Sequence, residues 1–245
     1  MDETQPGNPF LRAINLEYDA DAPERIAHYQ PTGKAVEFLK CVSGETSNRA
    51  FFVIAPYGSG KSIGATYLLH LIENRSSARP VLASIGERLE HVSPEMTDFA
   101  QNRISQDNLH GIVIALEGAI QDIGEAVGRA AAASLRRLGL KLRARQVDKL
   151  TLSASGIQGA IQIIDYLVQS ATHSTAKTRI DRIAIIWDEF GRHVEQIVRS
   201  GRPDRLADIQ TLAEYAARPQ ALPVTFGPIM HQGLLQYAAG INQTA

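Results

Sequence analysis

Cysteine and net charge are the two things that this chain has least of. Its 245 residues include one cysteine, Cys41, which excludes an internal disulfide and a metal cage built from thiolates. The 25 Lys and Arg residues are offset by 26 Asp and Glu residues, so the formal net charge is −1. A chain without excess charge has no global electrostatic footprint for nucleic acid, and any such contact must come from a local patch.

Long apolar runs are also missing. No segment approaches the roughly 18 uninterrupted apolar residues of a membrane span. The start, MDETQPGNPFLRAINLEYDADAPER, is acidic and has no continuous apolar core, so we do not expect a secretory signal. With 44% hydrophobic residues the chain can still bury a full core. We therefore expect a soluble cytoplasmic protein without membrane contact, built as one large α/β domain or as one domain with a small appendage.

The stretch RAFFVIAPYGSGKSIGATYLLHLIE, residues 49–73, has the pattern of a strand, a glycine-rich turn and a helix. Its turn, APYGSGKS, carries the phosphate-binding pattern G-x-x-x-x-G-K-[ST], except that Ala55 stands where the first glycine is expected. This position only has to be small, so the methyl group of Ala55 removes no phosphate-binding group. The apolar run before the turn and the helical spacing after it supply the context that the motif requires.

Each part of this turn has an expected role in binding ATP. Glycines at 58 and 60 let successive backbone N–H groups curl around the phosphates. Lys61 reaches the β- and γ-phosphates, and Ser62 offers a hydroxyl to Mg²⁺ at the start of a helix, whose dipole favours the anion. The predicted nucleotide-binding residues are Pro56, Tyr57, Gly58, Ser59, Gly60, Lys61, Ser62 and Ile63.

Apolar strands and helical patterns alternate along the rest of the chain, which favours an α/β fold. We expect a three-layer P-loop sheet, mostly parallel, with helices on both faces and helical insertions. Residues 1–31 are predicted to form an N-terminal arm with one short turn, and residues 32–245 an ATPase core. The expected strands are 50–54, 78–86, 111–116, 183–187 and 224–230, and the expected helices are 33–42, 63–73, 93–105, 119–138, 157–171 and 204–217.

Four of these strands run directly into polar residues, with Ile54 leading into the phosphate loop and Leu116 into Glu117. In a doubly wound parallel sheet, such strand ends converge on one edge, where ligands bind. Asp188 and Glu189 end the third strand. We expect Asp188 to hold the Mg²⁺ shell beside Ser62, and Glu189 to polarise a water for in-line attack on the γ-phosphate.

The fourth strand ends in His231 and Gln232. In ATPases of this kind, the strand between the phosphate-loop strand and the acidic strand usually ends in a polar residue that contacts the attacking water or the γ-phosphate. Both side chains are therefore predicted catalytic residues, together with Glu189. The sequence does not choose between the histidine and the glutamine.

Taken together, these features resemble the branch of P-loop ATPases that uses an additional catalytic glutamate, which includes the AAA+ and RecA-like ATPases. The strings APYGSGKS and IIWDEFGRHVE, preceded by NPF and HYQPTGKA, are similar to the N-terminal ATPase module of large bacterial P-loop proteins, including those of phage-exclusion and DNA-modification defence systems. The resemblance covers the chain from about Asn8 onward. It implies ATP and Mg²⁺ as ligands, and a homo-oligomer or a larger multi-protein complex as the working form.

The first functional hypothesis is a Mg²⁺-dependent ATPase whose hydrolysis drives movement in a larger assembly, with DNA contact left open. AAA+-like proteins continue into a last core strand and a helical lid, and we expect both to be missing here. The alternative is therefore a non-catalytic, ATP-dependent interaction switch, or a fragment that needs residues from a partner. A small-molecule kinase ranks third, because a carboxylate directly after Asp188 suits water activation.

Three further features have a functional and a structural interpretation. Tyr29, Gln30 and Pro31 occupy the place of an adenine wall in many P-loop ATPases, although an ordinary packing arm is at least as consistent with the sequence. The basic stretch RRLGLKLRARQVDK, residues 136–149, is favoured as a solvated face over a nucleic-acid or partner contact. Arg192 and Arg202 follow the acidic strand and are not included in the predicted site.

Overall fold

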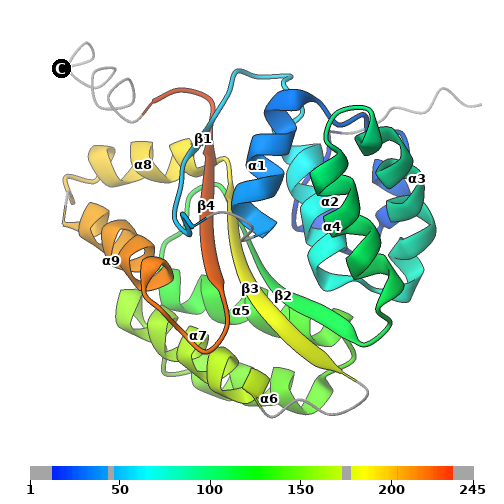
Figure 1. Ribbon diagram of the computed structural model, residues 1–245. Coiled ribbons are helices and arrows are strands. Elements are labelled where there is room, and N and C mark those ends of the chain that lie inside the picture. Colours follow the sequence, from blue (N-terminus) through cyan, green and yellow to red (C-terminus); the bar gives the residue numbers. More distant parts are fainter. Residues whose placement is uncertain (1–12, 44–46, 173–177, 203, 234–245) are drawn as a thin grey trace, which may run out of the picture.

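The centre of the molecule is a sheet of parallel strands (Figure 1). The computed structural model describes residues 13–43, 47–172, 178–202 and 204–233. Within these residues, the strands lie in the order β1 (Val53–Ile54), β4 (Val224–Met230), β3 (Arg179–Asp188) and β2 (Leu109–Glu117), and every pairing is parallel. The strand that ends in His231 therefore lies between the phosphate-loop strand and the acidic strand, as the sequence predicted.

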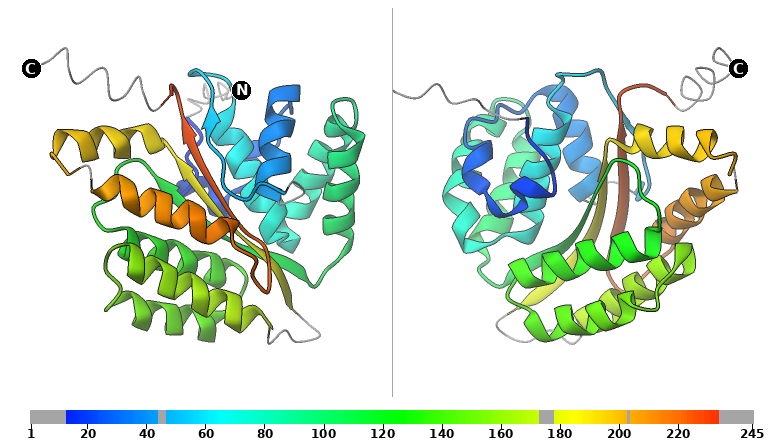
Figure 2. Two further views of the ribbon diagram at one scale, coloured as in Figure 1. Left: turned by 60° about the vertical axis from the view of Figure 1, so that its left-hand side comes forward. Right: turned by 180° about the vertical axis from the view of Figure 1, so that it is seen from behind.

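Helices cover both faces of the sheet (Figure 2). Parallel strands joined by crossovers are buried on both faces, which explains the nearly continuous apolar runs of β2, β3 and β4. One layer contains α5 (Ile123–Arg137), α6 (Lys141–Thr151), α7 (Gly156–Thr172), α8 (Phe190–Arg199) and α9 (Arg205–Ala217). The other contains α1 (Gly33–Ser43), α2 (Lys61–Glu73), α3 (Arg79–Glu90) and α4 (Pro94–Ser105). The predicted three-layer α/β fold is confirmed.

Two hydrophobic clusters fill the spaces between these layers. Trp187, Phe190 and Phe226 are fully buried in the cluster under α5 to α9, and Tyr67 is buried in the cluster under α1 to α4. Of the described helices, none is long and apolar enough to cross a bilayer.

The predicted arm is more structured than expected where it is described. Residues 18–26 form two short 3₁₀ helices, η1 (Tyr18–Asp21) and η2 (Pro23–Ile26), and a third, η3 (Ser76–Ala78), follows α2. Leu16 and Ile26 are fully buried in the cluster with α2, so this segment packs as part of the core. Residues 1–12 of the arm and residues 234–245 of the predicted core lie outside the described residues.

One predicted element is wrong, and one is shorter than predicted. Residues 78–86 were expected to be a strand, but Arg79–Glu90 is helix α3. Pro80 stands in its first turn, where proline is tolerated, and Leu82, Ile85 and Leu89 are buried at helical spacing. The first strand covers only Val53–Ile54, with an isolated bridge at Ala50.

The other predicted elements are confirmed to within a few residues. Ser93 caps α4 by accepting a hydrogen bond from the N–H of Met96. The helix predicted to begin near residue 119 begins at Ile123, because Asp122 caps it by accepting from the N–H of Glu125. The strand 224–230 has the predicted bounds.

Candidate active site at the carboxyl edge of the sheet

Residues 55–60, which carry the predicted phosphate-binding pattern and are called the phosphate loop for that reason, lie between β1 and α2. Gly58 and Gly60 have φ values of +73° and +82°, which are left-handed conformations that favour glycine. A Cβ built on Gly58 would meet nothing within 4 Å, so the positive φ and not crowding is what favours glycine at this position. The N–H of Ala55 donates to the carbonyl of Met230 at 3.2 Å and ties the start of the loop to the end of β4.

Lys61 folds back over its own loop. Its Nζ donates to the carbonyl oxygens of Ala55 and Pro56, both at 2.7 Å, and lies 3.4 Å from Oγ of Ser59. Partial burial lowers the pKa of Lys61, and the charge of Asp188 opposes that shift. The ammonium group therefore lies inside the loop and within electrostatic range of the acidic strand end.

Ser62 and Ile63 occupy the first turn of α2. The carbonyl of Ser62 accepts a hydrogen bond from Oγ1 of Thr66, and the side chain of Ile63 packs against the cluster under α1 and α2. The Ser62 side chain is half-buried. It lies in the first turn of α2, and the leading N–H groups of a helix together with a hydroxyl favour an anion at this place.

The acidic pair lies at the end of β3. Asp188 is 3% exposed, and its Oδ1 accepts from the backbone N–H of Glu189 at 2.9 Å. Glu189 precedes α8 with φ +51°, an uncommon conformation for a residue that is not glycine. Its Oε2 lies 2.9 Å from Nε of Arg192, one turn further along the helix. Strained residues of this kind concentrate at functional sites.

His231 contacts the phosphate loop directly. Its ring stacks on that of Tyr57 with centroids 3.5 Å apart and planes inclined by 20°. Burial and the charge of Lys61 lower the pKa of His231, while Glu189 and Asp188 oppose the shift. Its Nδ1 is shielded from solvent without a hydrogen-bond partner among the described residues. Gln232, by contrast, is exposed.

The structure thus brings Lys61, Asp188, Glu189 and His231 together at one edge of the sheet.

The residues considered as an adenine wall differ in their exposure to solvent. Tyr29 is 5% exposed and packs on Tyr67 with ring centroids 5.6 Å apart, while Gln30 is exposed. Burial of Tyr29 is consistent with the packing-arm alternative for that residue.

Glu117 is a further carboxylate at this edge that the sequence alone did not assign to the site. It was recognised as a polar strand end but was given no role. It lies opposite Asp188 in the parallel register, and its Oε1 accepts from Nδ2 of Asn15 at 2.5 Å. The pKa of Glu117 is raised to about 7, first by burial and then by the carboxylates of Asp188, Glu17 and Glu189. The apolar run before Glu117 was the available signal, because it fixed the strand end.

A metal ion at this edge would rely on few protein ligands. Throughout the described part of the chain, no three His, Cys, Asp or Glu side chains gather closely enough to hold a metal ion. Ser62 and Asp188 could still serve Mg²⁺, since this ion usually keeps several waters and binds one or two carboxylates together with substrate phosphates.

The basic stretch 136–149 is mostly surface, as favoured from the sequence. Arg136 pairs with Asp148 at 2.5 Å, and Lys141, Arg145 and Lys149 are exposed on α6. Arg137 differs, because its guanidinium is bound to buried Glu73.

Comparison with known proteins yielded no match: no family model, no curated protein and no solved structure is significantly similar to this chain.

Proposed function

We propose that the protein is a Mg²⁺-dependent ATPase whose active site is the carboxyl edge of the sheet. The observation that carries this proposal is the position of β4 between β1 and β3. This strand order brings the ammonium of Lys61, the carboxylates of Asp188 and Glu189 and the ring of His231 close enough for their charges to influence one another.

The residues have distinct tasks in this proposal. The loop around Gly58 and Gly60 receives the phosphates, and Lys61 exchanges its contacts with loop carbonyls for phosphate oxygens. Mg²⁺ supplies charge neutralisation at the phosphates when bound, and Ser62 and Asp188 are the residues that would hold it. Glu189 orients and polarises the attacking water. His231 lies on the loop side and contacts the γ-phosphate, whereas Gln232 faces solvent.

The resemblance to AAA+ and RecA-like ATPases extends the proposal to a homo-oligomer or larger assembly, in which hydrolysis drives remodelling. DNA or a defence complex as the setting rests on that resemblance alone.

A non-catalytic ATP-dependent switch is the second candidate, and a specific contact favours it. The carboxylate of Glu189 pairs with Arg192 at 2.9 Å. In this alternative, Arg192 keeps Glu189 away from the water, and ATP binding changes only the conformation or partners of the protein.

Binding of ATP with Mg²⁺ tests the proposal before any turnover is measured. Lys61→Ala removes the cation at the phosphate loop, and we expect calorimetry to show at least a 100-fold loss of affinity. Lys149→Ala, on the exposed surface of α6, is the matched control and should bind like the parent chain. Equal affinity of the Lys61→Ala variant and the parent would remove the nucleotide-binding assignment.

A further inference from the structure

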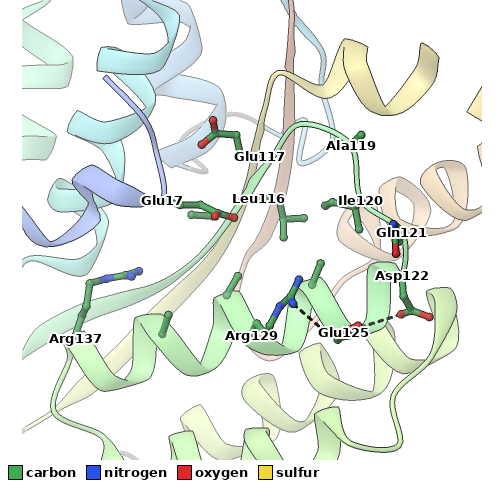
Figure 3. Close-up of a pocket in the computed structure, with 14 residues that line it drawn as sticks. Glu17, Leu116, Glu117, Ala119, Ile120, Gln121, Asp122, Glu125, Arg129 and Arg137 are labelled. Carbon is green, nitrogen blue, oxygen red and sulfur yellow. Dashed lines mark hydrogen bonds and ion pairs between the residues drawn. The ribbon is translucent and has the colours of Figure 1, made fainter. Parts of the chain in front are cut away.

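A groove of about 690 Å³ runs along the outer edge of β2 (Figure 3). Its floor is the carboxyl end of β2, from Ala115 to Glu117, and one wall is α5, from Glu125 to Arg137. Glu17 borders it near the strand end. The groove touches the proposed ATPase site only through Glu117, so it is a separate feature of the surface.

The floor of the groove presents backbone groups that lack partners. Among the described strands, β2 has a neighbour on one side only, because it lies at the end of the sheet order. The N–H of Gly118 donates to Asp188 of β3, whereas the N–H of Val113 points away from β3 and donates to Oγ of Ser134 at 3.0 Å. Backbone direction alternates along a strand, so the N–H and C=O of Ala115 also point outward.

Within the described part of the chain, the outward N–H of Ala115 has no side-chain acceptor comparable to Ser134, which accepts from the N–H of Val113. Ala115 is 5% exposed, and among the described residues its outward groups have no hydrogen-bond partner. Outward backbone groups at a sheet edge favour a partner strand, so the groove floor is suited to a ligand that supplies a donor and an acceptor at strand spacing. An extended peptide backbone does this.

The helical wall leaves room for such a backbone. Ala126, Ala130 and Ala133 face the groove at helical spacing along α5. Their small side chains allow a second chain to approach the strand edge, just as small residues allow close approach of backbones between packed helices. A bulky residue at Ala130 would fill this space.

The charges around the groove are unequal. Arg129 pairs with Glu125 at 3.0 Å on the surface, and Arg137 pairs with buried Glu73 at 2.6 Å, so each guanidinium group already has a carboxylate partner. Glu117 keeps one carboxylate oxygen, Oε2, shielded from solvent and without a side-chain hydrogen-bond donor among the described residues, and the backbone N–H of Glu17 lies near this carboxyl group. With Glu17 beside it, this end of the groove is complementary to a cationic side chain.

We propose that the groove binds an extended peptide segment of a partner protein, which adds to the edge of β2 and directs a lysine or arginine side chain to Glu117 and Glu17. Backbone hydrogen bonds to Ala115 supply the pairing, and the basic side chain supplies selectivity. Because Glu117 lies opposite Asp188, an occupied groove alters the charge next to the proposed ATPase site. The binding itself does not depend on that function.

Fluorescence anisotropy with a labelled peptide tests this inference without nucleotide. The probe is fluorescein-Val-Thr-Lys-Thr-Val-amide, compared with a version in which Glu replaces Lys and a version N-methylated at the two threonines. We expect saturable binding of the first peptide at low salt, and at least tenfold weaker binding of the other two. No binding of the first peptide up to millimolar protein would overturn the proposal.

Two variants locate the site. Ala130→Phe should bind the first peptide at least tenfold more weakly, because the ring fills the groove. Gln146→Phe, on the exposed face of α6, should bind it with the affinity of the parent. Equal binding to both variants rejects the groove. If spermidine displaces the peptide and N-methylation has no effect, the site recognises cations without strand pairing, and the proposal fails.

Discussion

Helix α2 joins two polar clusters that differ in what holds their charged groups. Its first residue, Lys61, lies in the phosphate loop, and its last, Glu73, lies at the opposite end of the sheet. Glu73 is fully buried and accepts from Oγ of Ser134 at 2.7 Å and from the guanidinium of Arg137 at 2.6 to 3.0 Å. Near it, Arg103 donates to the carbonyls of Leu71 and Ile72 at the end of the same helix.

The carboxyl edge has the opposite character. Glu189 has positive φ, one nitrogen of His231 has no partner among the described residues, and Lys61 is held by carbonyls that a phosphate could replace. The cluster around Glu73, which we call the closed cluster, consists of buried ion pairs between protein side chains, and such pairs fix the structure around them. Strained groups and groups held by replaceable contacts, as in the open cluster at the carboxyl edge, are typical of sites that bind or react. The comparison therefore separates a cluster that stabilises the fold from one that is proposed to function, along a single helix.

Removing the buried charge of Glu73 from the closed cluster should cause the largest change in stability among these predictions. Glu73→Gln leaves the guanidinium of Arg137 buried without a countercharge, so we expect the free energy of unfolding to fall by about 3 kcal/mol. Urea denaturation measures it. Glu125→Gln removes the exposed pair with Arg129 and should cost under about 0.5 kcal/mol. Similar losses in the two variants would mean that Glu73 does not organise this end of the sheet.

The acidic pair of the open cluster should separate binding from hydrolysis. Glu189→Gln keeps the size and removes the charge that polarises the water, so turnover should fall about 100-fold while ATP stays bound. Asp188→Asn should also weaken Mg²⁺-dependent binding, since its carboxylate is assigned to the metal. Phosphate release and calorimetry, in the full assembly if the isolated chain has no basal rate, measure these effects. Parental turnover by Glu189→Gln would favour the switch alternative.

Glu117, which lies opposite Asp188, tests whether charged groups at the carboxyl edge lower the stability of the fold. Its pKa is about 7 in the folded protein and 4.5 as the ordinary value, so the folded state binds more protons between these values. The stability that this group contributes is present below pH 4.5 and is lost as the pH rises through 7. Glu117→Gln should therefore be more stable than the parent at pH 8, by about 1 kcal/mol after allowance for partial solvation.

Urea denaturation at pH 5 and pH 8 checks this sign. The advantage of the Glu117→Gln variant should be smaller at pH 5, where the folded parent carries the proton. Glu87→Gln on the exposed side of α3 is run in parallel to report the effect of removing a surface carboxylate. An advantage that is equal at the two pH values would contradict the raised pKa.

Local pattern was sufficient for much of the fold. Long apolar runs predicted β2, β3 and β4, and Ser93 and its spacing predicted α4, because burial and capping act over a few residues. Residues 78–86 misled the prediction because a short apolar run after a proline fits a strand and a helical turn equally well. The loop between β1 and α2 was located from its own motif, and its binding of phosphate stays a prediction.

Long-range contacts could not be predicted in the same way. Glu73 meets Arg137 across 64 residues, and Asn15 meets Glu117 across 102. Such pairs depend on how helices and strands pack, and the residues around them carry no local signal. The same holds for the ring of Tyr57 on His231, which the sequence brought to the same edge without predicting their contact.

Substitution of Ala55 should have the smallest effect on ATP affinity and stability, and it allows two positions of the same loop to be compared. Ala55 does not have positive φ, unlike Gly58 and Gly60, and its contributions are made by the backbone, which donates to Met230 and accepts from Lys61. Ala55→Gly should therefore leave ATP affinity within a few-fold and lower the free energy of unfolding by about 0.5 kcal/mol through added backbone freedom. Gly60→Ala, with φ at +82°, should weaken ATP binding more, because the methyl group is strained where the loop turns into the helix. Calorimetry on both variants decides between the positions. A tenfold gain in affinity from Ala55→Gly would mean that the first position of the loop restricts the nucleotide, and that this end of α2 is less open than its geometry indicates.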